Sequence, residues 1–98
     1  MTLLKIFRAS EWQAFEADKR FDGSADDLRD GFIHLSTPEQ VQGTLDRHFA
    51  NETGLIIAEV GLANDPALRL EPSRGGALFP HLYRSLLSTD IADWKPAT

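Results

Sequence analysis

The chain contains no cysteine, which excludes disulfide bonds, thiolate metal sites and cysteine nucleophiles. It also has no run that approaches the roughly 20 apolar residues of a membrane-spanning helix. The apolar stretch within the first eight residues is too short for the core of a signal peptide. From these absences we expect a cytoplasmic protein that makes no contact with a membrane.

Cationic residues are scarce, because ten Lys and Arg stand against fifteen Asp and Glu, a formal net charge of −5. Proteins bind a nucleic-acid backbone through clustered cationic charge, so this balance argues against a nucleic-acid polymer as partner. A small anionic or nucleotide-like ligand stays compatible with it, since one or two local arginines are enough. The length of 98 residues predicts a single domain over 1–98.

Periodicity of the apolar residues predicts an α+β fold, with small, mostly antiparallel sheets and two main helices. Strands are expected at 3–8, 32–36, 55–60 and 68–71, then around 84–87, with 90–92 left open. The segment 55–60 is nearly all apolar, which is typical of a central strand covered on both faces. Residues 73–76 are expected to form a flexible loop, and 94–98 a tail.

Two helix starts carry capping signals. Ser10 is expected to cap the first helix, which buries Trp12 and Phe15 on one face. Thr37 and Pro38 are expected to begin the second, which runs to about Ala50 with an apolar stripe of Val41, Leu45 and Phe49. Between them, 25–31 predicts a polar loop or one helical turn. Its charged run is interpreted as solvated: Asp26, Asp27, Arg29 and Asp30.

The strand 32–36 carries the first candidate site. Its alternation places Phe32, His34 and Ser36 on one face and the two aliphatic residues on the other. The helix that follows Thr37 offers free N–H groups and a partial positive charge, which favour an anionic group. We therefore expect His34 to act in catalysis and Ser36 and Thr37 to bind ligand. The alternative is a core histidine that is hydrogen-bonded to a backbone carbonyl.

The second candidate segment runs from Glu71 to Tyr83. His81 and Tyr83 share a face if this stretch is extended, and Arg74 supplies a cation in a glycine-rich loop. A histidine with a glutamate suits general acid–base work, so His81 and Glu71 are expected to be catalytic and Arg74 and Tyr83 to contact ligand. A glycine turn, a solvated arginine and an aromatic core residue are the alternatives.

Several other kinds of site find no support in the sequence. The three histidines show no metal-ligand spacing such as His-x-x-x-His, so no metal site is expected. His48 lies near the apolar stripe of its helix and is expected to be a core or rim residue. No phosphate loop, dinucleotide fingerprint or serine elbow is present. Cofactor and oligomeric state stay open.

Two blocks of residues carry a resemblance that spans about 4–87. The chain resembles the DUF952 family of short bacterial and plant proteins of unknown function. The matching residues are Gly31-Phe32-Ile33-His34-Leu35-Ser36-Thr37, Gln40-Val41, Thr44, Phe49, Leu70-Glu71, Arg74-Gly75-Gly76 and Phe79-Pro80-His81-Leu82-Tyr83.

The resemblance implies a distant similarity to the ADP-ribosyltransferase fold, in which two small sheets enclose a cleft for a nicotinamide dinucleotide. By that analogy His34 contacts a ribose, with Ser36 beside it, and Tyr83 stacks on nicotinamide. The sequence departs from the pattern at the acidic residue that orients the attacked ribose. A transferase has this glutamate on a late strand, whereas Glu71 precedes Tyr83 here. Fold similarity alone does not establish function.

Three functions are compatible with these observations. The first is an enzyme acting on a nucleotide or sugar-phosphate-like ligand through the residues named above. The second is a non-catalytic module that binds a small ligand in the same cleft. The third is a structural or interaction protein in which both blocks only stabilise the fold.

Overall fold

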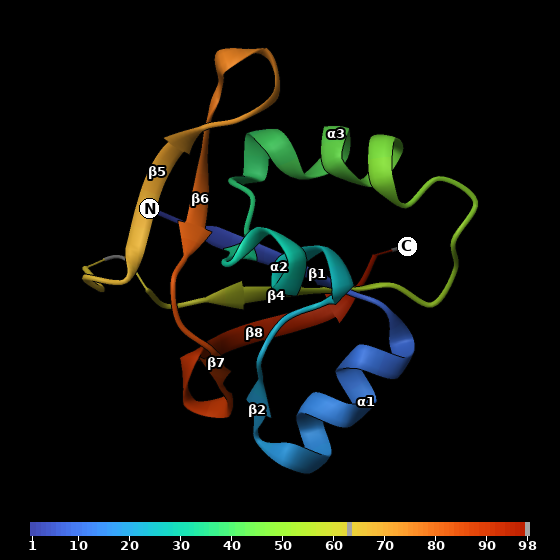
Figure 1. Cartoon of the computed structure of the whole chain (residues 1–98). Helices are drawn as coiled ribbons and strands as arrows, with labels where there is room; N and C mark the ends of the chain where they lie inside the picture. The colour runs from blue at the N-terminus through green and yellow to red at the C-terminus, as the bar shows by residue number, and fades with distance from the viewer. Residues whose placement is uncertain (63, 98) are drawn as a thin grey trace.

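Three small antiparallel sheets and three α-helices make up the computed structural model within the residues it describes, 1–62 and 64–97 (Figure 1). The first sheet has the order β1 (Leu3–Phe7), β4 (Ile56–Val60), β8 (Ile91–Pro96). The second pairs β2 (Arg20–Phe21) with β7 (Leu86–Leu87). The third has the order β3 (Ile33–His34), β6 (Leu78–Leu82), β5 (Leu68–Pro72). This arrangement confirms the predicted α+β class and the central position of β4.

The helices are α1 (Ala9–Asp18), α2 (Ala25–Asp30) and α3 (Pro38–His48), with short 3-10 turns η1 (Arg74–Gly76) and η2 (Ser88–Asp90). In the described part of the chain, none of the helices is long and apolar enough to cross a bilayer. The predicted cap of α1 is wrong. Arg8 is the N-cap residue, because the Glu11 carboxylate lies three positions after it and accepts its backbone N–H at 2.8 Å. Ser10 therefore lies inside the first turn.

An aromatic cluster fills the main core between α1 and the first sheet. The ring of Phe7 lies 5.1 Å from that of Trp12 and 4.9 Å from that of Phe21, and Phe15 stacks on it. Such offset and edge-to-face pairs add to the stabilisation that burial itself supplies. Trp12 and Phe15 are both buried, as their helical spacing predicts.

The C-terminal part of the chain departs from the prediction. The expected tail belongs to β8, which pairs with β4, and the ring of Trp94 lies 5.2 Å from that of Trp12. All but the first residue of β8 are exposed, so no alternation of apolar and polar residues marks it as a strand. The strand expected at 84–87 is also shorter. Arg84 instead uses its guanidinium to bind both Asp65 and Asp90 at 2.8 Å.

Helix α3 begins where Thr37 and Pro38 predict, and the Thr37 N–H donates to Gln40 Oε1 at 3.1 Å. It ends at His48, two residues early. Its stripe packs half-buried against a small cluster made of Ile6, Leu55 and Ile57, but no residue within the helix is fully buried. The loop predicted at 73–76 is a tight turn. The Ser73 N–H donates a hydrogen bond to the Ala77 carbonyl at 2.9 Å and closes it.

Candidate functional site

One face of the third sheet carries the polar residues of the candidate site. The register of β3 and β6 sets His34 directly opposite His81, and their ring centroids lie 5.8 Å apart. Phe32 stacks on the His81 ring at 3.9 Å and lies 4.6 Å from the His34 ring. The predicted alternation of the strand is thus correct at its centre, because Ile33 and Leu35 are buried on the opposite face.

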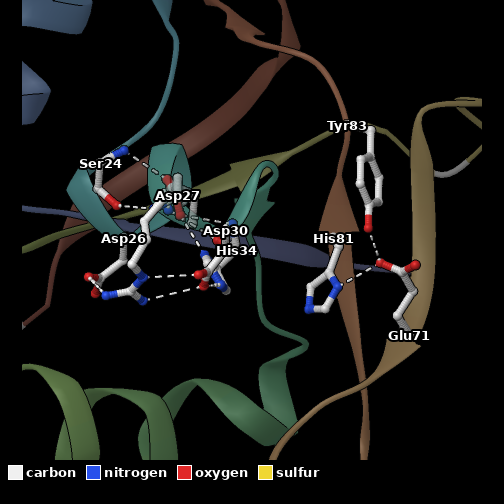
Figure 2. Close-up of polar contacts among 10 residues, drawn as sticks. Ser24, Asp26, Asp27, Asp30, His34, Glu71, His81 and Tyr83 are labelled. Atoms are coloured by element: carbon white, nitrogen blue, oxygen red, sulfur yellow. Dashed lines mark hydrogen bonds and ion pairs between the residues drawn. The ribbon is translucent and has the colours of Figure 1, made fainter.

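His34 lies between two carboxylates of α2 (Figure 2). Its Nδ1 is 2.6 Å from Asp27 Oδ1, and its Nε2 is 3.0 Å from Asp30 Oδ2. An ionised carboxylate can only accept a hydrogen bond, so both contacts are hydrogen bonds only when the ring carries a proton on each nitrogen. The backbone N–H of His34 also donates to Asp27, at 3.1 Å.

Asp27 is almost completely buried and is the centre of this group. Its carboxylate accepts from Lys5 Nζ at 2.9 Å and from the Ser24 N–H at 2.9 Å, in addition to His34. Burial by itself would raise the pKa of Asp27. The hydrogen bond from His34, the charge of Lys5 and the Ser24 N–H outweigh it and hold that pKa well below its usual range.

A second carboxylate–histidine pair lies on β5 and β6. Glu71 Oε1 is 2.8 Å from His81 Nδ1 and accepts a hydrogen bond from the Tyr83 hydroxyl at 2.6 Å (Figure 2). These two bonds, the tyrosine's first, lower the pKa of Glu71. The same bond raises the pKa of Tyr83, because it favours the protonated phenol.

A hollow of about 410 Å³ lies between α2, α3 and the strands that carry the two histidines. His34, His81, Asp27 and Asp30 line it, whereas Glu71 and Tyr83 lie outside its lining. The α3 side contributes Glu39, Gln40, Gly43, Thr44, Arg47 and His48. Because no residue of α3 is fully buried, the helix does not fill the space beside the two histidines, and a polar hollow is left there.

The remaining predicted residues are placed differently. Ser36 is buried, and its hydroxyl lies 3.3 Å from that of Thr44 rather than in the lining of the hollow. Thr37 caps α3. Tyr83 is 44% exposed and lies on the same face as His81, as their alternation predicts. His48 is exposed, which contradicts the core alternative of its prediction and leaves the rim alternative. The side chain of Arg74 lies outside the described part of the structure.

The interpretation of 25–31 as a solvated turn is wrong for Asp27. That residue is in the first turn of α2 and only 2% exposed, because Lys5 reaches it from the adjacent β1. Sequence reasoning missed both residues. A lysine at the centre of the apolar strand Leu3–Phe7 was the available signal, since buried lysines are almost always paired. Nothing local indicated which acid would pair with it.

The site offers acid–base groups. Among the residues that the structure describes, no group of three His, Asp or Glu side chains is arranged to hold a metal ion. Two histidines whose partners are carboxylates can instead exchange protons with a ligand, provided that a nitrogen faces it.

Two solved structures of a bacterial protein have a similar fold. A crystal structure of protein CC0527 from Caulobacter crescentus matches with a TM-score of 0.93 and 43% identity, covering 98% of this chain and 85% of that one. Its solution NMR structure matches with a TM-score of 0.86 and 44% identity, covering 97% and 83%.

No curated protein matches the sequence. The model of the family described as "Protein of unknown function (DUF952)" matches residues 6–94. This span includes both candidate histidines and their carboxylate partners. The chain belongs to the DUF952 family.

Proposed function

We propose that the hollow binds a small ligand that carries a phosphate group, such as a nucleotide or a sugar phosphate, and that His81 acts on it as a general acid–base. The observation that carries this proposal is the Glu71–His81 pair. Glu71 is bound to Nδ1 of the ring, and His81 is among the residues that line the hollow.

The pair fixes which nitrogen of His81 is available. The lowered pKa of Glu71 favours its carboxylate form, which can only accept, so Nδ1 carries a proton. In the neutral ring Nε2 then holds the lone pair. In Figure 2 the second ring nitrogen points away from Glu71. A carboxylate that orients a histidine in this way is the arrangement by which enzymes present a base to a substrate.

Two features support a phosphate-bearing ligand. His34, when protonated between Asp27 and Asp30, is a cation at the wall of the hollow. Arg47 projects from α3, lines the hollow and is exposed, and within the described residues no carboxylate pairs with it. A guanidinium and an imidazolium together match the charge and geometry of a phosphate. The phosphate would compete with Asp30 for His34 Nε2.

Thermal shift with a panel of nucleotides, nicotinamide dinucleotide and sugar phosphates tests binding. A ligand at 100 times its dissociation constant adds about 2.7 kcal/mol of stability. His34→Ala and Arg47→Ala should lose most of that shift. Arg20→Ala removes an exposed arginine of β2 and should keep it. If no compound shifts the wild type, or if all three variants respond like it, the proposal fails.

Product analysis separates an enzyme from a binding module. His81→Asn should bind the ligand but reduce turnover by a factor of about 10² to 10⁴, the usual contribution of general acid–base catalysis. Binding without turnover by the wild type would favour the second candidate function, a non-catalytic module. That candidate is supported by the same hollow, which would then only bind the ligand. The ADP-ribosyltransferase analogy stays a prediction, and a shift by the nicotinamide dinucleotide alone would favour it.

A further inference from the structure

Within the described residues, the outer edge of β5 is open at its centre, Leu70, while its ends are blocked: the Leu68 N–H donates to the Asp65 carbonyl at 3.1 Å, and Pro72 has no N–H. The other edges of the two three-stranded sheets are blocked as well. On β1, Leu4 exchanges hydrogen bonds with Ser36 at 2.8 and 2.9 Å. On β3, the His34 N–H is bound by Asp27. On β8, Asp93 accepts the Trp94 N–H at 2.8 Å, and Pro96 has no N–H. These are the usual ways in which proteins protect an edge strand from pairing.

The ladder between β5 and β6 shows which groups of β5 face outward. The Tyr83 N–H donates to the Ala67 carbonyl at 2.8 Å, and the Ser73 N–H donates to the Ala77 carbonyl at 2.9 Å, at the two ends of the ladder. Bonded and non-bonded positions alternate along an antiparallel pair. The backbone N–H and C=O of Leu70 therefore point to the free edge, and its side chain is also exposed.

The sequence of β5, Leu68-Arg69-Leu70-Glu71-Pro72, is complementary to itself about Leu70. An antiparallel copy centred there sets Leu70 opposite Leu70, where the two residues exchange a pair of backbone hydrogen bonds. Each Arg69 then lies opposite Glu71 of the second copy, on the same face of the sheet. Opposite charges at directly facing positions stabilise such a pair.

Both charged groups have unused capacity. Glu71 binds His81 and Tyr83 through Oε1 alone, so its Oε2 accepts nothing from the described residues. Arg69 lies over the Tyr83 ring at 5.6 Å, and no carboxylate in the described chain forms an ion pair with it.

We propose that two copies of the chain join edge to edge through β5, which continues the third sheet across a twofold axis. Arg69 of each copy then binds Glu71 Oε2 of the other. Glu71 also binds His81, so Arg69 of the second copy contacts the carboxylate that orients this histidine of the candidate site. The contact is small, so the dimer is of the weak class rather than the permanent one. This inference does not depend on the identity of any ligand.

Sedimentation velocity over a range from about 5 to about 500 µM tests the dimer, because weak interfaces dissociate in that range. The wild type should shift from monomer to dimer, with the shift weakened by salt. Arg69→Glu sets like charges opposite each other and should raise the dissociation constant at least about tenfold. The double variant Arg69→Glu/Glu71→Arg restores opposite charges and should recover the dimer, even though it disrupts the His81 contact.

Two further variants keep the test specific. Leu70→Pro removes an N–H that β6 does not use, so it should abolish the dimer while the fold, followed by circular dichroism, is retained. Lys95→Glu reverses a charge on the closed edge of β8 and should leave the dimer intact. A wild type that stays monomeric, a dimer insensitive to Arg69→Glu, or a dimer broken by Lys95→Glu would each overturn the proposal.

Discussion

The ammonium of Lys5 lies 2.9 Å from Asp27 Oδ2, and both side chains are buried. Lys5 comes from the centre of β1 and Asp27 from the first turn of α2, so the ion pair fastens this short helix to the first sheet. Lys5 also donates to the His34 carbonyl at 3.1 Å. The pair that holds α2 in place therefore also positions the strand and the carboxylates around His34.

Replacing Lys5 by methionine should destabilise the protein by about 3–5 kcal/mol, because it leaves the charge of Asp27 buried without a partner. Urea unfolding followed by circular dichroism measures the loss. Lys95→Met, which removes an exposed lysine of β8, is the control and should change stability by less than about 0.5 kcal/mol. A loss in Lys5→Met no larger than that of the control would show that the pair does not stabilise the fold.

The pKa of Asp27 predicts how stability depends on pH. That pKa is lowered in the folded protein, while in the unfolded chain it is near 3.8. The stability that the carboxylate contributes is therefore fully present above the unfolded value and is lost as pH falls toward the folded value. Unfolding free energy should fall below pH of about 4, and Asp27→Asn should flatten this fall. Asp18→Asn, at an exposed position, should retain it; an unchanged slope in Asp27→Asn would contradict the assignment.

Part of the site could be predicted because its signals are local. Strand alternation sets His34 on the polar face, and a threonine followed by proline marks the start of α3; both follow from a few neighbouring residues. The same is true of the shared face of His81 and Tyr83. These features depend on backbone periodicity, which the sequence alone carries.

The rest depends on contacts between distant segments. Lys5 and Asp27 are 22 positions apart, and their pairing follows from how β1 and α2 pack. An acidic run on a short helix is usually solvated, so the burial of Asp27 had no local signal. Similarly, β8 is an exposed edge strand whose apolar and polar residues do not alternate. It is recognised as a strand only from its pairing with β4 and from the contact of Trp94 with Trp12.

Gly23 should tolerate no side chain, because it has a φ of 134° and an added Cβ would lie 2.8 Å from the Cβ of Asp27. Gly23→Ala should therefore destabilise the fold by at least about 1 kcal/mol and displace Asp27. Gly43 is the matched control, since its added Cβ meets no atom within 4 Å and the residue lies within α3. Gly43→Ala should instead stabilise by about 0.5–1 kcal/mol. Thermal unfolding of both variants measures the two changes in stability. Equal changes in Gly23→Ala and Gly43→Ala would contradict the prediction.

Tyr83→Phe should raise the pKa of Glu71 toward its ordinary value of 4.5. The hydrogen bond from the Tyr83 hydroxyl is the largest of the interactions that lower this pKa. The hydrogen bond favours the carboxylate, and phenylalanine keeps the ring but removes the donor. Carboxyl NMR titration measures this pKa directly. His81 then faces a carboxylate that takes up a proton at a higher pH, so the lower limit of any pH–rate profile should move upward as well. Because Tyr83 lies outside the hollow, ligand binding at neutral pH should be retained. An unchanged Glu71 pKa would show that the tyrosine does not support the carboxylate that orients His81.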